Sequence, residues 1–135
     1  MNDNAVSGDR PDTVLVVESE VLVRLAISEY LRHCGYRVIE AASADEALIL
    51  LAKADIAVDV VFSAVALGGA TDGFALARRV RTERPGLNVI LTGTLEKAVH
   101  EAGDLCEEGP HLKKPYEPQN VVDWIKRLRN LRRDT

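Results

Sequence analysis

The sequence lacks any long apolar run and is poor in aromatic residues. Aromatic side chains make up 4% of its 135 residues, and no apolar stretch approaches the roughly 20 residues that a membrane-spanning helix needs. No segment at the amino end combines a basic start with an apolar centre, as a secretion signal does. We therefore expect a chain that makes no membrane contact and works in the cytoplasm.

Cysteine is scarce, and the chain contains only Cys34 and Cys106. Their wide separation has neither the spacing of a metal site nor that of a redox pair. Both residues fall in helical patterns, where a small apolar side chain is suitable. The sequence therefore predicts two reduced thiols with a structural role, and no metal site.

An excess of positive charge is also absent, because 17 basic residues stand against 21 acidic ones and give a formal net charge of −4. This balance argues against a general nucleic-acid binder. The one basic stretch, KRLRNLRR near the carboxyl end, is most simply a solvated helix end that interacts favourably with the helix dipole. Binding of duplex DNA or of an acidic partner through this stretch is the alternative, and its salt dependence would test it.

Short β-branched apolar runs alternate with amphipathic helical patterns along the chain. Such alternation favours parallel strands joined by right-handed crossovers, with helices on both faces of one sheet. We therefore expect a three-layer α/β sandwich in which residues 12–132 form the domain, between tails at 1–11 and 133–135. The expected strands are 13–17, 36–41, 58–62, 88–92 and 111–114, each followed by a helix.

Two helix starts carry capping signals. Ser43 and Glu46 have the spacing of a capping box, in which each side chain accepts a free backbone N–H of the first turn. Asp72 can cap the next helix, whose residue Phe74 is expected to face the core. The pattern at 95–105 is weaker and predicts a short, comparatively mobile helix.

The stretch after the third strand marks the expected site. Parallel sheets gather ligands at the carboxyl ends of their strands, so the residues around Ser63 and Ala64 lie where chemistry would be expected. Glu18, Ser19 and Glu20 follow the first strand at the same edge. Ala64, however, carries no functional group.

The motifs VLVVESE, CGYRVIEA, VFSAVALGGATDGFALARRVR, RPGLNVILTG and LKKPYEP follow one another in this order. In order and spacing they resemble the receiver domain of bacterial response regulators, the phosphoacceptor part of two-component signalling. The resemblance implies a flavodoxin-like (βα)5 fold with the parallel strand order 2-1-3-4-5. It also implies a site at the carboxyl ends of strands one, three and five.

In that family, two acidic residues after the first strand and an aspartate ending the third hold Mg²⁺. A histidine kinase phosphorylates the aspartate, and a hydroxyl residue and a lysine bind the phosphoryl oxygens. The resemblance assigns the retained positions to Glu18, Thr92 and Lys114. It also shows two departures: Ser19 replaces the second acid, and Ala64 replaces the phosphoacceptor.

The two departures remove the expected chemistry. A methyl group cannot accept a phosphoryl group, and Mg²⁺ prefers carboxylate oxygens, so Mg²⁺ binding should be weak or absent. Ser63 should point away from the site, because neighbouring strand residues face opposite sides. Glu20 is not expected to act as a substitute acceptor. Glu18 and Lys114 are either a remnant of a phosphate site or simply an ion pair, and we favour the ion pair, in which the lysine neutralises an otherwise costly carboxylate.

The sequence therefore predicts a degenerate receiver that is not an enzyme and works as a phosphorylation-independent interaction module. Its partner would be a sensor histidine kinase, another signalling protein or a second copy, meeting the fourth helix, fifth strand and fifth helix. A pair between Glu101 and Arg127 or Arg129 could fix a symmetric dimer. The residues expected on this face are His111, Leu95, Val99, Glu101, Val122, Arg127 and Arg129.

The sequence leaves two other functions open. A conventional phosphorelay receiver could have lost its aspartate at position 64 by mutation, although Ser19 favours a naturally degenerate site. A flavodoxin-like cofactor protein is disfavoured by the low aromatic content and by the lack of a hydroxyl-rich loop after the first strand.

Overall fold

A parallel sheet forms the centre of the computed structural model, which describes residues 13–108 and 116–134. The strand order within the described residues is β2-β1-β3-β4, which confirms the expected flavodoxin-like arrangement up to the fourth strand. The fifth strand, expected at 111–114, lies outside the described residues. The strands are β1 (Thr13–Val17), β2 (Arg37–Ala41), β3 (Val60–Ala64) and β4 (Asn88–Thr92).

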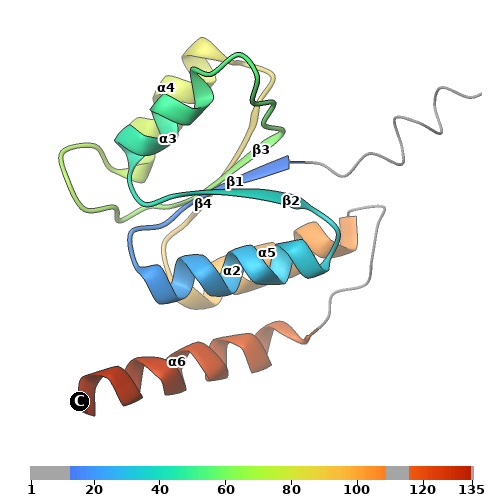
Figure 1. Cartoon of the computed structure of the whole chain (residues 1–135), viewed down its shortest axis with the longest axis vertical. Helices are drawn as coiled ribbons and strands as arrows, with labels where there is room; N and C mark the ends of the chain where they lie inside the picture. The colour runs from blue at the N-terminus through green and yellow to red at the C-terminus, as the bar shows by residue number, and fades with distance from the viewer. Residues whose placement is uncertain (1–12, 109–115, 135) are drawn as a thin grey trace, which may run out of the picture.

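Helices cover both faces of the sheet, as the alternating pattern predicts. Figure 1 shows α3 and α4 on one face and α2 with α5 on the other. The last helix, α6, packs on α5 and α2 and lies farther from the sheet than either. The helices are α2 (Val21–His33), α3 (Ala44–Leu51), α4 (Gly73–Glu83), α5 (Leu95–Glu108) and α6 (Pro118–Asp134).

The central strand β1 divides the core into two apolar clusters. Val14 and Val16 pack toward α2, α5 and α6, whereas Leu15 and Val17 pack toward α3 and α4. All four side chains are almost completely buried. Because successive strand residues point to opposite faces, a strand buried on both sides must be apolar throughout.

The helix starts follow their capping signals. Ser43 Oγ accepts the N–H of Glu46 at 3.1 Å, and Glu46 Oε1 accepts the N–H of Ala42 at 2.7 Å, one residue before the expected donor. Asp72 Oδ1 accepts the N–H of Ala75 at 2.8 Å. These bonds satisfy backbone donors that have no partner inside the helix.

Two expectations about helices are wrong. Phe74 is 53% exposed, because α4 turns Gly73, Leu76 and Val80 toward the sheet and leaves Phe74 on the outer side. Helix α5 is also longer than expected, since it continues to Glu108 and buries apolar residues along its whole length.

The cysteines also differ from the prediction. Cys34 and Cys106 form a disulfide with their Cα atoms 5.4 Å apart, so the expectation of two reduced thiols is wrong. The bond joins the end of α2 to the last turn of α5 across 72 residues of sequence. The packing of α5 on α2 brings the two cysteines together, and sequence spacing carries no sign of that contact.

Candidate functional site: a pocket at the carboxyl edge of the sheet

The ends of β1, β3 and β4 meet at one edge of the sheet. Strand pairing sets Val17 beside Ser63, and Ala64 beside Thr92. A pocket of about 240 Å³ opens at this edge. Its lining includes Glu18, Ser19, Glu20, Ala64, Thr92 and Arg129.

Glu18 is held by the turn that follows β1. Its carboxylate Oε2 accepts the N–H of Glu20 at 2.9 Å, while its carbonyl accepts a bond from Arg24 Nη1 at 2.9 Å. Burial is the main cause that raises the pKa of Glu18, and the bond from Glu20 N–H works against it. Glu18 is therefore a carboxylate that is costly to ionise in the folded chain.

Glu20 is paired with a residue from the other end of the chain. Arg129 Nε donates to Glu20 Oε2 at 2.8 Å and Arg129 Nη2 donates to Glu20 Oε1 at 2.5 Å, which is a two-pronged ion pair. The two residues lie 109 positions apart. The pairing with Glu20 raises the pKa of Arg129. A cation from α6 thus neutralises one of the two acids of the pocket.

Ala64 presents only a methyl group to the pocket, where β3 ends. The neighbouring Ser63 is fully buried, and its hydroxyl donates to the carbonyl of Ala64 at 2.9 Å. Among the described residues, Ser63 is not part of the pocket lining. Thr92 is buried at the end of β4, next to Ala64 in the sheet.

Gly73 packs directly against the backbone that follows β3. Its N–H donates to the carbonyl of Val65 at 2.9 Å. A Cβ atom at this position would lie 2.1 Å from the carbonyl oxygen of Ala64. The start of α4 is therefore packed tightly against the end of β3 that carries Ala64.

The donor set does not fit Mg²⁺. Glu20 is occupied by Arg129, Ser19 offers a hydroxyl and Ala64 offers nothing, so among the described lining residues Glu18 is the single carboxylate left for a metal. Within residues 13–108 and 116–134, no group of three His, Cys, Asp or Glu side chains is arranged to hold a metal ion.

Part of the predicted site and face is placed differently or lies outside the structure. His111 and Lys114 are outside the described residues, so the pair between Glu18 and Lys114 stays a prediction. Val99 and Val122 are completely buried in the cluster between α5 and α6, so the expectation that they offer apolar surface is wrong. Leu95 is partly buried against the same cluster.

The charged residues of that face also have partners within the chain. Glu101 Oε2 lies 3.4 Å from Lys97 Nζ within α5, and Arg129 forms an ion pair with Glu20 in the pocket. Arg127 is exposed on α6. The sequence did not predict the role of Arg129 at the pocket, because Glu20 at the start of α2 and Arg129 in α6 share no sequence pattern that indicates their contact.

Substitution of Glu18 tests the cost of its burial. A raised pKa means that the folded chain binds the proton more tightly than the unfolded chain, so stability falls as pH rises through the range just above the ordinary Glu value of 4.5. Glu18→Gln keeps an acceptor for the N–H of Glu20 and should raise the free energy of unfolding at pH 7, because it removes the cost of ionising a partly buried carboxyl group.

Urea denaturation of both chains between pH 4 and pH 8 measures this effect. The variant should lack the decline that Glu18 contributes in that range. Asp55→Asn, on an exposed loop residue, is the control and should leave the pH dependence unchanged. Equal stability of Glu18→Gln and the original chain at pH 7 would contradict a buried, costly carboxylate.

The sheet order, the covering helices and the acid-bearing loop after β1 define the class of flavodoxin-like α/β proteins. The sequence matches the response regulator receiver domain over residues 14–126. The chain therefore belongs to the receiver-domain family of response regulators.

Curated proteins similar in sequence support this family assignment. ResD of Bacillus subtilis, a transcriptional regulatory protein, is 30% identical over 115 residues, which are 85% of this chain and 47% of ResD. The response regulator FleR of Pseudomonas aeruginosa is 34% identical over 84% of this chain and 24% of FleR. The chain thus spans less than half the length of these curated relatives.

Solved structures show the same fold. A response regulator receiver domain protein from Clostridium thermocellum superposes with a TM-score of 0.59 at 21% identity, covering 89% of this chain and 98% of that one. The chemotaxis protein CheY4 of Vibrio cholerae superposes with a TM-score of 0.56 at 27% identity, covering 87% of this chain and 98% of CheY4.

Proposed function

We propose that this receiver domain is a phosphorylation-independent protein-interaction module of two-component signalling. The observation that carries the proposal is Ala64 at the end of β3, where the family needs a nucleophile. Phosphoryl transfer requires an oxygen in line with the leaving group, and a methyl group cannot supply one. The domain is then a binding module rather than an enzyme.

The charges of the pocket support the same proposal. A competent site needs several free carboxylates to hold a metal, whereas here Glu20 is bound by Arg129 and Ser19 carries no charge. Because Arg129 belongs to α6 and Glu20 caps α2, the ion pair also ties α6 to the start of α2. In this proposal the pocket residues have a structural role, which is to hold the last helix against the start of α2.

We propose a sensor histidine kinase or another signalling protein as the partner, and the cytoplasm as the location. One curated relative is named a sensor kinase, CckA of Brucella abortus, which is 32% identical over 86% of this chain and 12% of CckA. No helix within the described ranges is long and apolar enough to cross a membrane. Self-association through α5 and α6 is a second mode, in which exposed Arg127 rather than Arg129 is available to Glu101 of another copy.

Binding of a phosphoryl mimic tests the proposal. Amide NMR spectra recorded with and without Mg²⁺ and beryllofluoride should show no coupled movement of the Glu18, Ala64 and Thr92 peaks. The doubly substituted chain Ser19→Asp/Ala64→Asp restores two carboxylates and should bind Mg²⁺ at least about tenfold more tightly, equivalent to about 1.4 kcal/mol.

The variant Ser19→Asn/Ala64→Asn is the matched control, because it has nearly the same volume without the charges. It should bind Mg²⁺ no better than the original chain. Movement of the pocket peaks in the original chain on addition of beryllofluoride would show that another residue accepts the mimic, and would overturn the proposal.

A further inference from the structure

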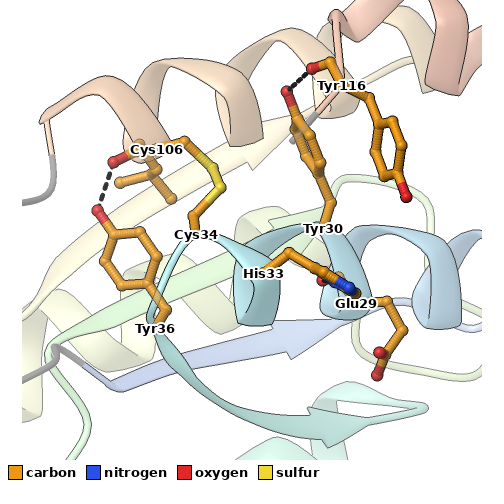
Figure 2. The surroundings of a disulfide bond; sticks show 8 residues. Glu29, Tyr30, His33, Cys34, Tyr36, Cys106 and Tyr116 are labelled. Atoms are coloured by element: carbon orange, nitrogen blue, oxygen red, sulfur yellow. Dashed lines mark hydrogen bonds between the residues drawn. A yellow bond between two sulfur atoms is a disulfide. The ribbon is translucent and has the colours of Figure 1, made fainter. Parts of the chain in front are cut away.

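The disulfide between Cys34 and Cys106 is almost completely enclosed, with the two residues 1% and 2% exposed. Cys34 is the residue that ends α2, and Cys106 lies in the last turn of α5. Figure 2 shows the sulfur bridge spanning the gap between these two helix ends. The bond therefore attaches the carboxyl end of α5 to the carboxyl end of α2.

Two tyrosines hold the same region by separate bonds. The hydroxyl of Tyr36, two residues after Cys34, donates to the carbonyl of Leu105 beside Cys106. The hydroxyl of Tyr30, one turn before Cys34, donates to the carbonyl of Tyr116 at 2.7 Å, just ahead of α6 (Figure 2). Tyr30 near the end of α2 and Tyr36 just before β2 thus hold Tyr116, ahead of α6, and Leu105, near the end of α5.

The position of α6 depends on α5. Val122 and Ile125 of α6 are fully buried in the same cluster as Val99 of α5. In addition, Lys126 Nζ of α6 lies 2.7 Å from Glu96 Oε2 of α5. A bond that fixes α5 on α2 therefore also stabilises the packing of α6 on α5.

We propose that Cys34 and Cys106 form a reversible thiol–disulfide site whose oxidation state sets how firmly α5 and α6 are docked on α2. The oxidant is a low-molecular-weight disulfide such as oxidised glutathione. One cysteine thiolate attacks a sulfur of that disulfide and releases one small thiol. The second cysteine thiolate then attacks the protein sulfur of the mixed disulfide and releases the other small thiol.

The location of the pair makes this exchange feasible despite its burial. Helix ends open locally at much lower cost than the centre of a core, and both cysteines lie at such ends. Glu107 and Glu108, which complete α5 after Cys106, are exposed to solvent. Opening the last turn of α5 is enough to let a small thiol or disulfide reach Cys106.

Thiol counting is the first part of the test. The full chain is equilibrated with oxidised or reduced glutathione, unfolded in denaturant and treated with N-ethylmaleimide, and its intact mass is measured. The oxidised sample should add no maleimide and the reduced sample two. Two maleimides on the chain equilibrated with oxidised glutathione would overturn the proposal.

The second part measures the consequence of the bond. A bond that closes a loop of this length restricts the unfolded chain, so reduction should lower Tm by roughly 10 °C. Amide hydrogen exchange in α5 and α6 should become at least about tenfold faster on reduction, while exchange in α3 and α4 changes less.

Cys34→Ala/Cys106→Ala is the matched control, because both positions are buried and apolar. Its Tm and exchange rates should be the same with and without reductant. If this variant does not fold, comparing the oxidised and reduced forms of the original chain still tests the proposal without a mutation. An unchanged Tm and unchanged exchange in α5 and α6 on reduction would overturn the proposed role of the bond.

Discussion

Gly73→Ala is expected to lower the free energy of unfolding by about 3 kcal/mol. The added methyl group would lie 2.1 Å from the carbonyl oxygen of Ala64 and 2.9 Å from the Cα of Val65. Both obstacles are backbone atoms, so no side-chain rotation can relieve the overlap. Either α4 or the end of β3 has to move, and the pocket edge moves with it.

Urea denaturation followed by far-UV circular dichroism measures this loss. Gly68→Ala, in the loop that precedes α4, is the matched control, because a Cβ atom there meets nothing within 4 Å. Its effect should stay within about 0.5 kcal/mol. Similar losses in both variants would mean that the loop tolerates alanine poorly for reasons other than the contact with Ala64.

Ile125→Ala should lower the free energy of unfolding by a comparable amount, about 3 kcal/mol. Ile125 is completely buried where α6 meets α5 and α2, so its truncation leaves a cavity in that cluster. The same change should also weaken the pair between Arg129 and Glu20, one turn farther along α6. Urea denaturation measures the first effect, and the chemical shifts around Glu20 report the second.

Leu131→Ala is the control on the same helix, because Leu131 is 58% exposed. Alanine favours the helix in both variants, so propensity does not separate them. The control should change stability by less than about 0.5 kcal/mol. Equal losses of unfolding free energy for Ile125→Ala and Leu131→Ala would contradict the described packing of α6 on α5 and α2.

Most of the fold could be predicted from local signals in the sequence. Buried parallel strands are continuous β-branched runs, as at Val14 to Val17, and helix starts carry a capping residue such as Ser43 or Asp72. These features depend on neighbours in sequence, so a single chain displays them. The strand pattern also predicts where the pocket lies, because sites in parallel sheets form at the carboxyl ends of the strands.

The errors concern contacts between distant segments. Phe74 is an apolar residue in a helix, but the close approach of Gly73 to the strand end sets which side of α4 faces the core. The partners of Arg129 and of Cys34 lie 109 and 72 residues away. No periodicity or motif links such residues, since only the packing of α5 and α6 on α2 brings them together.

The two apolar clusters also differ in when a growing chain can complete them. Among the described residues, the cluster under α3 and α4 uses none later than Val89, whereas the opposite cluster needs Ile125. A ribosome delivers the amino end first. During synthesis, one side of the sheet is therefore finished while the other has only α2 as cover. For that interval, Val16 and Phe62 remain within reach of water or of a chaperone.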